Sequence, residues 1–525
     1  MINLLVCFYG NDAEAKLWSE VLADLRADFV APVFLGQPGR VPRSLSPEEL
    51  IVPDNWDAII SEFQPSEKAL EEYGKFTSAS SFSEIMRIIL KTMDRRDYSG
   101  TFRSLDQDVV ARILFLFYMT KMAQYEIDGV IFDILPHTPD SMIVYQVAKF
   151  LKIPTLSFEI CGVAPVRFPV TELASMNRFL LPKAGLSSTN FRNSETSSRI
   201  SQALEARWGG FHQTAHVEEY ISAQQLRSQR KAIYRASKWR SFFSRFGKNN
   251  GAIAMTFPGL NMKSRSVRAL SGWGLEKLRR AALIQSINRA TSSSVNPEIF
   301  DDDRHSRPFD GSFARKDSSE QLKGALFALH FEPESTCFPE GLPVMNQFDA
   351  VIEARRLLAP DRKLLVKEHP VQALSTNQGY MGRSPFFYSA VRGLRNTRMV
   401  PSQVSAKKLL DRVDVVFTLT GTVAFEGLAL GKQVVYFGSP WWEGCPGTVK
   451  TFPGVLKGGS FPNFSVSAAE DAEVANFIRK RVEECGVFYP KNLENVDQFV
   501  QTKYELSVIL VNWFKSVENI PEPER

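Results

Sequence analysis

The sequence has few cysteines and no long apolar run, and both shortages limit what the protein can be. The cysteines are odd in number and far apart, and they form no Cys-x-x-Cys pair: Cys7, Cys161, Cys337, Cys445 and Cys485. This pattern argues against a disulfide framework or a zinc knuckle and is typical of a reducing cytosol. The most apolar helical stretch, 109–119, contains Arg112 and is shorter than the roughly 20 residues that cross a bilayer. We therefore expect no membrane-spanning segment.

The N-terminus also lacks the features of a secretory signal peptide. Its first residues, MINLLVCFYG, contain no basic region and no small-residue cleavage site. We interpret 2–10 as the first β-strand of the fold. Together with the cysteine pattern, this predicts a cytoplasmic protein.

Acidic residues are nearly absent from one long segment. The chain of 525 residues has a net charge of +5, but 227–289 contains 15 Lys or Arg residues and a single acid, Glu276. This segment therefore carries about +14, which leaves about −9 for the rest of the chain. One basic segment in an otherwise acidic chain does not indicate a nucleic-acid-binding protein, so we expect no nucleic acid as a partner.

Short apolar runs alternate with helical patterns in the first 160 residues. The helical pattern at 107–126 precedes an apolar strand at 128–134. A helix over 140–151 and a strand over 154–160 complete a β-α-β arrangement, which is typical of a parallel sheet covered by helices. Strands at 2–10 and 28–36 are predicted to join the same sheet.

The alternation resumes after a polar stretch rich in Ser, Asn, Arg and Lys. Strands are predicted at 324–331, 363–369, 414–420 and 433–438, and helices at 343–358, 405–412 and 422–430. The predicted fold class is therefore α/β, with two Rossmann-like, doubly wound domains and a basic helical insert. The predicted divisions are an N-terminal domain over 1–182, the insert over 183–320 with a helix at 217–246, a second domain over 321–490, and a C-terminal part over 491–525 whose helix, 496–517, packs back across the domain boundary.

Polar residues follow three predicted strands of the second domain, at 330–336, 367–370 and 418–427. Ligands bind doubly wound sheets outside the carboxyl ends of the strands, so we expect these segments to line one cleft. In the third segment, Thr418, Thr420 and Thr422 surround Gly421 directly before a helix. This arrangement suits a phosphate group; the alternative is an ordinary turn with a threonine N-cap.

The helix after this turn has its own signals. Glu426, one turn into it, either reaches a ribose hydroxyl or is exposed at the surface. Gly431 is predicted to end the helix as a left-handed glycine before the next strand.

The other two segments supply an imidazole and two acids. Pro370 cannot donate to the sheet and marks the end of its strand, while His369 is either structural or a donor to a phosphate oxygen. Alternation along the strand places Lys367 on the same face as His369. Glu332 and Glu334 are predicted to lie on one side of an extended chain, either in a solvated loop or as a catalytic carboxylate.

Three runs of sequence resemble the capsule polysaccharide biosynthesis family: LHFEPEST, LLVKEHP and VDVVFTLTGTVAFEGLALGKQVVYFG, within about 324–440. This family includes the bacterial Kdo transferases and has a GT-B architecture of two Rossmann-like domains. The resemblance implies a metal-independent glycosyltransferase that moves a sugar, Kdo-like, from a CMP-activated donor to a saccharide or lipid-linked acceptor of the cell envelope. It implies no cofactor besides this nucleotide-sugar donor.

The resemblance also implies roles for single residues. His369 and Pro370 match the His-Pro motif that contacts the CMP leaving group, and Thr420 to Thr422 match the turn that binds the nucleotide phosphate. Glu334 falls where the Kdo transferases carry a catalytic aspartate in a Gln-x-x-x-Asp pattern, but His330 stands in place of the glutamine. Glu159, at the end of a first-domain strand, resembles an acceptor-side acid. The candidate catalytic residues are thus Glu334, Glu159, Glu332 and His330, and the candidate nucleotide-binding residues are His369, Pro370, Lys367, Thr420, Gly421, Thr422 and Glu426.

Two other functions stay open. Teichoic-acid-type CDP-polyol phosphotransferases also carry a His-Pro pair, but they tend to show an acidic TD-x-SS turn where this chain has TLTGT. A catalytically silent GT-B scaffold is the other alternative, because His330 and Glu334 depart from the family pattern. Asp301, Asp302 and Asp303 imitate a metal-binding motif, but they follow no predicted strand, and we predict no metal site.

The basic insert mixes aromatic with basic side chains. The run KWRSFFSRFGK (238–248) and the amphipathic run LEKLRRAALI (275–284) are typical of helices that lie on a membrane surface. This predicts contact between 227–289 and anionic lipid, and thus peripheral attachment to the inner face of the inner membrane. The alternative is that the aromatic side chains pack onto the protein.

Overall fold

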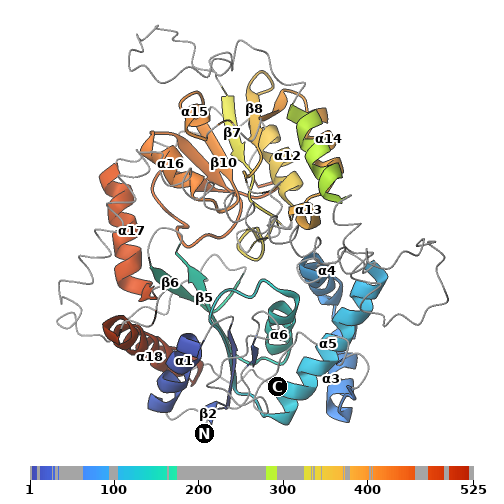
Figure 1. Ribbon diagram of the computed structural model, residues 1–525, viewed down its shortest axis with the longest axis vertical. Helices are drawn as coiled ribbons and strands as arrows, with labels where there is room; N and C mark the ends of the chain where they lie inside the picture. The colour runs from blue at the N-terminus through green and yellow to red at the C-terminus, as the bar shows by residue number, and fades with distance from the viewer. Residues whose placement is uncertain are drawn as a thin grey trace, which may run out of the picture.

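The computed structural model of the chain contains two β-sheets, one above the other (Figure 1). It describes residues 3–8, 12–25, 28–29, 33–34, 59, 63–93, 104–161, 165–173, 279–291, 324–332, 334, 337–344, 346–370, 372, 379–400, 404, 406–455, 471–489, 493 and 496–518. The predicted helix at 217–246, the run 238–248 and Asp301 to Asp303 lie outside these residues.

The first sheet is built around β1 (Asn3–Phe8). In the described residues its strand order is β13-β6-β5-β4-β1-β2, with β3 also paired to β1; the bounds are β2 (Asp28–Phe29), β3 (Val33–Phe34), β4 (Gly129–Phe132), β5 (Thr155–Ile160), β6 (Val166–Val170) and β13 (Val487–Phe488). The pairs of β1 with β2, β3 and β4, and of β4 with β5, are parallel, whereas β6 and β13 are antiparallel additions.

Side chains alternate between the two faces of β1, as the pleat of a strand requires. Leu4 and Val6 pack into the core beneath α1 (Asp12–Asp24) and α18 (Val496–Glu518), while Leu5 and Cys7 face the opposite helices. Those helices are α3 (Glu67–Ser78), α4 (Phe82–Met93), α5 (Ser104–Gln124) and α6 (Pro139–Phe150). The sheet is therefore covered on both faces.

The second sheet has the order β12-β11-β10-β7-β8-β9, and all its pairs are parallel. Its strands are β7 (Gly324–Ala328), β8 (Lys363–Lys367), β9 (Thr397–Val400), β10 (Val415–Thr418), β11 (Gln433–Tyr436) and β12 (Thr448–Lys450). One face carries α12 (Gln347–Leu357), α14 (Pro385–Gly393) and a helix over 279–291; the other carries α15 (Ala406–Leu410) and α16 (Val423–Ala429). The predicted α/β fold class is confirmed.

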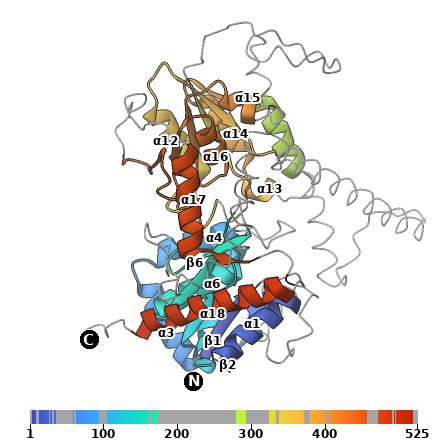
Figure 2. The ribbon, with the colours of Figure 1, turned by 90° about the vertical axis from the view of Figure 1, so that its left-hand side faces the viewer.

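The end of the chain returns to the first sheet. The helix α17 (Asp471–Cys485) contacts β6, and β13 pairs with β6, although 321–490 was predicted as a second-domain segment. Val487 and Phe488 are apolar, and pairing with the edge strand β6 buries both side chains. Figure 2 shows α17 running between the two sheets and α18 lying beside α1.

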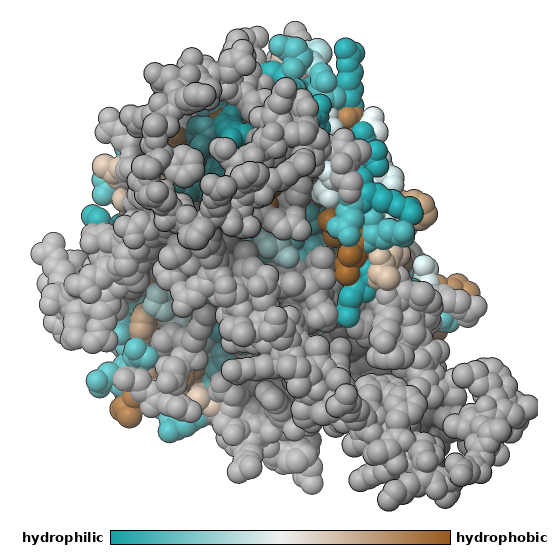
Figure 3. Space-filling model, turned by 45° about the horizontal axis from the view of Figure 1, so that its top comes forward, coloured by the Kyte–Doolittle hydropathy of each residue, from teal (hydrophilic) through white to brown (hydrophobic). Residues whose placement is uncertain are grey.

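Most element types match their predictions, but the strands are shorter. The predicted strand at 28–36 forms two separate two-residue strands, and the predicted strands at 324–331, 363–369 and 414–420 each stop two or three residues early. Gly431 has a φ of +65° and ends α16 as predicted. Among the described residues, no helix is both long and apolar enough to cross a bilayer. On the face drawn in Figure 3, the coloured residues are mainly hydrophilic, with apolar residues in small patches.

Candidate active site

The topological switch point of the second sheet lies between the neighbouring parallel strands β7 and β10. From β7 the chain proceeds through β8 to β9 on one side and then crosses to β10 on the other. Ligands bind at such a switch point, outside the carboxyl ends of the two strands. His330 follows β7 and Thr418 ends β10, and His330 Nε2 lies 2.9 Å from Thr418 Oγ1. The two strand ends predicted to share a cleft therefore meet.

His330 is buried and holds the turn after β10. Its Nε2 also accepts the N–H of Thr420 at 3.3 Å, which leaves the ring proton on Nδ1. The Gln347 side chain accepts the His330 N–H at 2.8 Å and donates to its carbonyl at 3.2 Å. Burial, with His369 and Arg383 nearby, lowers the pKa of His330 to about 3. His330 is thus a neutral acceptor that positions the turn from within the protein.

The turn itself has little room for a larger residue at its centre. The Gly421 N–H donates to Thr418 Oγ1 at 3.1 Å. A Cβ at position 421 would lie 2.9 Å from Thr418 Oγ1 and 3.0 Å from His330 Nε2. Thr422 is at the N-cap position of α16, but its side chain makes no capping bond, and the threonine hydroxyl that accepts a backbone N–H in this turn is that of Thr418. The amides of Thr420 and Gly421 are bonded within the protein, and Thr422 is exposed.

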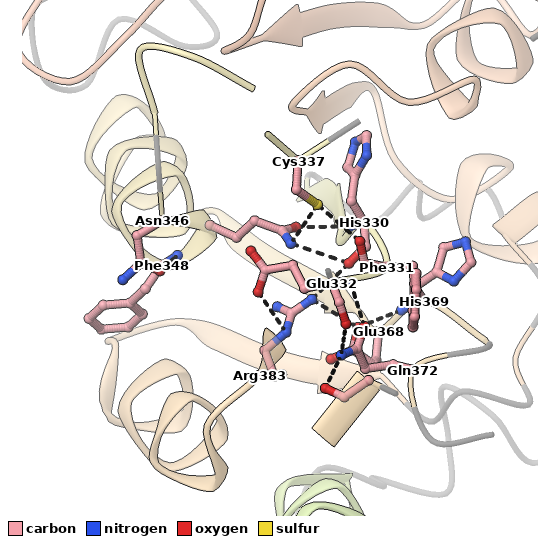
Figure 4. A network of polar contacts seen from close by, with 12 residues as sticks. His330, Phe331, Glu332, Cys337, Asn346, Phe348, Glu368, His369, Gln372 and Arg383 are labelled. Carbon is pink, nitrogen blue, oxygen red and sulfur yellow. Dashed lines mark hydrogen bonds and ion pairs between the residues drawn. The ribbon is translucent and has the colours of Figure 1, made fainter. Parts of the chain in front are cut away.

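A buried arginine that the sequence analysis missed lies behind the site. Arg383 Nη2 donates to the His330 carbonyl at 2.7 Å and lies 3.4 Å from Glu368 Oε1, and its Nε lies 3.5 Å from Glu332 Oε2 (Figure 4). Glu368 in turn accepts the Tyr388 hydroxyl at 2.6 Å and the His369 N–H at 2.7 Å. An arginine directly before a Ser-Pro helix start gives no sign of burial in the sequence, so this network was not predictable from a motif.

His369 lies beside this network with its imidazole directed away from Arg383 (Figure 4). Its ring centroid is 6.1 Å from that of Phe331. Burial, followed by the charges of Lys367 and Arg383, lowers the pKa of His369 to about 4. The imidazole is therefore neutral at physiological pH and offers a hydrogen bond rather than a fixed positive charge.

Lys367 supplies the positive charge near this imidazole. It is buried at the end of β8, and burial lowers its pKa to about 8 despite the opposing effects of Glu368 and Glu426. Burial raises the pKa of Glu426, and Lys367 opposes that shift. The charges of Lys367 and Glu426, from β8 and α16, thus affect each other's pKa.

Glu332 and Glu334, the two acids after β7, were predicted to lie on one side of an extended chain. The structure contradicts this prediction. Glu332 is buried, whereas Glu334 is exposed in a bend where its carbonyl accepts the N–H groups of Cys337 and Phe338, each at 3.1 Å. The chain turns here, so its alternation is lost. Glu332 is the acid that belongs to the buried network.

Glu159 lies at the junction of the two sheets. Its side chain is fully buried at the end of β5, and Oε1 accepts the N–H of Trp441 at 2.9 Å. The Trp441 ring stacks on Phe168 of β6 and on Phe425 of α16, with centroid separations of 5.4 and 5.6 Å. The predicted acceptor-side acid therefore contributes to the contact between the halves.

Part of the predicted membrane-binding segment packs onto the protein. In the helix over 279–291, Leu283, Ile287 and Ala290 are buried in the core of the second sheet. The apolar face of this helix is thus occupied by the body, which is the alternative considered for the segment. The remainder, 227–278, lies outside the described residues.

Residues 341–449 match a family model described as capsule polysaccharide biosynthesis protein. The predicted family resemblance is confirmed. The matched segment includes His369, Arg383 and the turn at Thr420 to Thr422, but it excludes His330, Glu332 and Glu159. No curated protein matches the chain.

Several solved structures show limited likeness. A beta Kdo 2,4 transferase, KpsC of Thermosulfurimonas dismutans, is 12% identical over 73% of this chain and 87% of its own, with a TM-score of 0.30. The beta Kdo 2,7 transferase KpsC of the same organism is 15% identical over 45% and 65% of the two chains, with a TM-score of 0.23. The UDP-GlcNAc 2-epimerase of Methanocaldococcus jannaschii is 11% identical over 98% and 100%, with a TM-score of 0.20.

Proposed function

We propose that this chain is a glycosyltransferase of bacterial surface polysaccharide biosynthesis. Its donor is a CMP-activated, Kdo-like sugar, and its acceptor is a saccharide or a lipid-linked saccharide. The observation that carries this proposal is the convergence of Lys367, His369 and the His330-held turn at the switch point of a parallel sheet. This convergence lies largely within the segment that matches the capsule polysaccharide biosynthesis family.

The reaction requires stabilisation of the leaving group and activation of the acceptor, and different residues serve each. When the bond from the anomeric carbon to the phosphate breaks, its electron pair goes to a phosphate oxygen, and the Lys367 ammonium and a His369 N–H stabilise that charge. The acceptor hydroxyl oxygen forms the new bond to the anomeric carbon and gives its proton to a carboxylate that acts as general base. Glu332 is the preferred base, because Glu334 is exposed and Glu159 is buried in the junction.

Calorimetric titration with CMP, CDP and UDP tests the proposal. We expect CMP to bind the wild-type protein and the His369→Ala variant to bind it at least about tenfold more weakly, a loss of about 1.4 kcal/mol. His137→Ala is the matched control, because His137 lies in the first half and its Nδ1 is 2.8 Å from the Leu135 carbonyl. If the wild-type protein binds none of the three nucleotides, the proposal is wrong.

Peripheral attachment to an anionic membrane forms a second, separate part of the proposal. It rests on the aromatic and basic residues of 227–278, since the apolar face of 279–291 is buried. Flotation with liposomes that contain anionic lipid tests it. Salt-sensitive binding is expected, and a protein that stays at the bottom of the gradient at low salt would contradict the attachment.

A further inference from the structure

A lysine of the first half reaches the site in the second half. Lys91 lies in the last turn of α4, a helix whose own contacts are with α3, α5 and α6. Its Nζ lies 3.9 Å from Oε1 of Glu332, which follows β7 of the other sheet. Figure 1 shows α4 below α13 (Gly379–Gly382), where the two halves meet.

Glu332 is fixed to the turn that carries the His-Pro pair. Its N–H donates to Gln372 Oε1 at 2.9 Å, and Gln372 Nε2 donates back to the Glu332 carbonyl at 3.0 Å. The N–H of Gln372 also donates to the His369 carbonyl at 3.0 Å. Gln372 thus connects Glu332 to His369, through its side-chain amide on one side and its backbone N–H on the other.

The Glu332 carboxylate lies between one cation from each half. Arg383 Nε approaches Oε2 at 3.5 Å from the second half, and Lys91 Nζ approaches Oε1 from the first. The Glu332 side chain is 9% exposed and the Lys91 side chain 32% exposed, so water screens this pair less than an ion pair at the surface. A carboxylate with a separate cation on each oxygen has little freedom to rotate.

We propose that Lys91 is a positioning residue of this site: it crosses from the first half and orients the Glu332 carboxylate beside the His-Pro turn. The proposal rests on the function proposed above, in which Glu332 serves the acceptor side of the reaction. The first half then contributes directly to the chemistry of the second. Moving α4 away would remove one of the two cations that contact Glu332 in the described part of the chain.

Hydrogen exchange of the ligand-free protein tests the contact without reference to any activity. The Lys91→Met variant keeps a long side chain but removes the charge, and we expect faster exchange in peptides that cover 329–332 and 368–372. Lys75→Met is the matched control, since Lys75 of α3 forms exposed ion pairs with Glu71 and Glu72. Wild-type exchange rates in both peptides of Lys91→Met would overturn the proposed contact.

Release of CMP from CMP-Kdo tests the positioning role. We expect Lys91→Met to release CMP about tenfold more slowly than wild type or worse, with its affinity for CMP changed by less than about twofold. Lys91→Arg should restore most of the rate, and Lys91→Met combined with Glu332→Gln should be no slower than Glu332→Gln alone.

Two outcomes contradict the positioning role: wild-type turnover in Lys91→Met, or a loss of CMP affinity as large as the loss of rate. The second result would make Lys91 a nucleotide ligand. If the wild-type protein neither binds CMP nor releases it from the donor, the proposed function fails, while hydrogen exchange still decides whether Lys91 holds Glu332 in place.

Discussion

His330 and His369 are both neutral imidazoles near Arg383, but their surroundings give them different tasks. His330 Nε2 is occupied by Thr418 and Thr420, whereas the His369 ring is directed away from the buried network. Sequence position alone favoured His330 as a catalytic residue, because it replaces the glutamine of a family pattern. Its bonds to Thr418 and Thr420 instead hold the turn after β10. We therefore expect the loss of His330 to lower the free energy of unfolding.

Replacing His330 with alanine is expected to destabilise the fold more than replacing His369. Without the imidazole, the Thr420 N–H and the Thr418 hydroxyl are left buried with one acceptor fewer, and an unsatisfied buried polar group costs about 1–3 kcal/mol. Denaturant unfolding of His330→Ala, His369→Ala and the wild type measures this difference. Equal or reversed losses would contradict the role of His330 in holding the turn.

The same imidazoles predict acid sensitivity. The pKa values of His330 and His369 are lowered to about 3 and about 4, so between about 6.5 and these values the unfolded chain binds protons that the folded chain does not. Stability should therefore fall as the pH falls from about 6.5. Melting temperatures between pH 7 and pH 5 test this, and His330→Gln should show a shallower decline. A decline as steep in the variant as in the wild type would argue against His330 as its source.

At the scale of elements, the turn between β10 and α16 depends on a glycine. Gly421→Ala brings a Cβ to 2.9 Å from Thr418 Oγ1 and 3.0 Å from His330 Nε2, so one of these groups must move. We expect a loss of about 1–3 kcal/mol in stability, typical of an overpacked site, and weaker CMP binding. Gly393→Ala is the control, because nothing lies within 4 Å of its Cβ position. Unfolding and CMP titration of both variants give the comparison, and equal results would contradict the tight turn.

Local patterns predicted the elements around this turn better than they predicted the site. An apolar run such as Val415 to Phe417 predicts a strand, and Gly431 predicts the end of a helix. Both predictions succeed because the signals are local. Arg383 and Gln372 join the site through contacts between segments far apart in the chain. Glu332 is buried and Glu334 exposed, although the alternation of an extended strand predicts the same side for both. Such long-range contacts leave no periodic signal in the sequence.

At the scale of the whole molecule, one cluster of buried side chains spans the two sheets. The same cluster of buried side chains includes Phe168 of β6, Phe425 of α16 and the indole rings of Trp441 and Trp442. Local alternation predicts two domains but carries no information on how they contact each other. Aromatic stacking across the junction and the pairing of β13 with β6 connect the two regions.

Trp441 is the residue of this junction whose loss should matter most. Its ring stacks between Phe168 and Phe425, whereas its bond to the buried Glu159 carboxylate comes from the backbone N–H and is kept in an alanine variant. Trp441→Ala should cost about 3–5 kcal/mol, as large-to-small changes in a core do. Because Phe425 belongs to the helix that follows the turn at Thr420 to Thr422, we expect weaker CMP binding as well. Calorimetric unfolding and CMP titration measure both effects, with Tyr504→Ala on the exposed face of α18 as the control. A Trp441→Ala variant as stable as that control would mean that the halves are held together elsewhere.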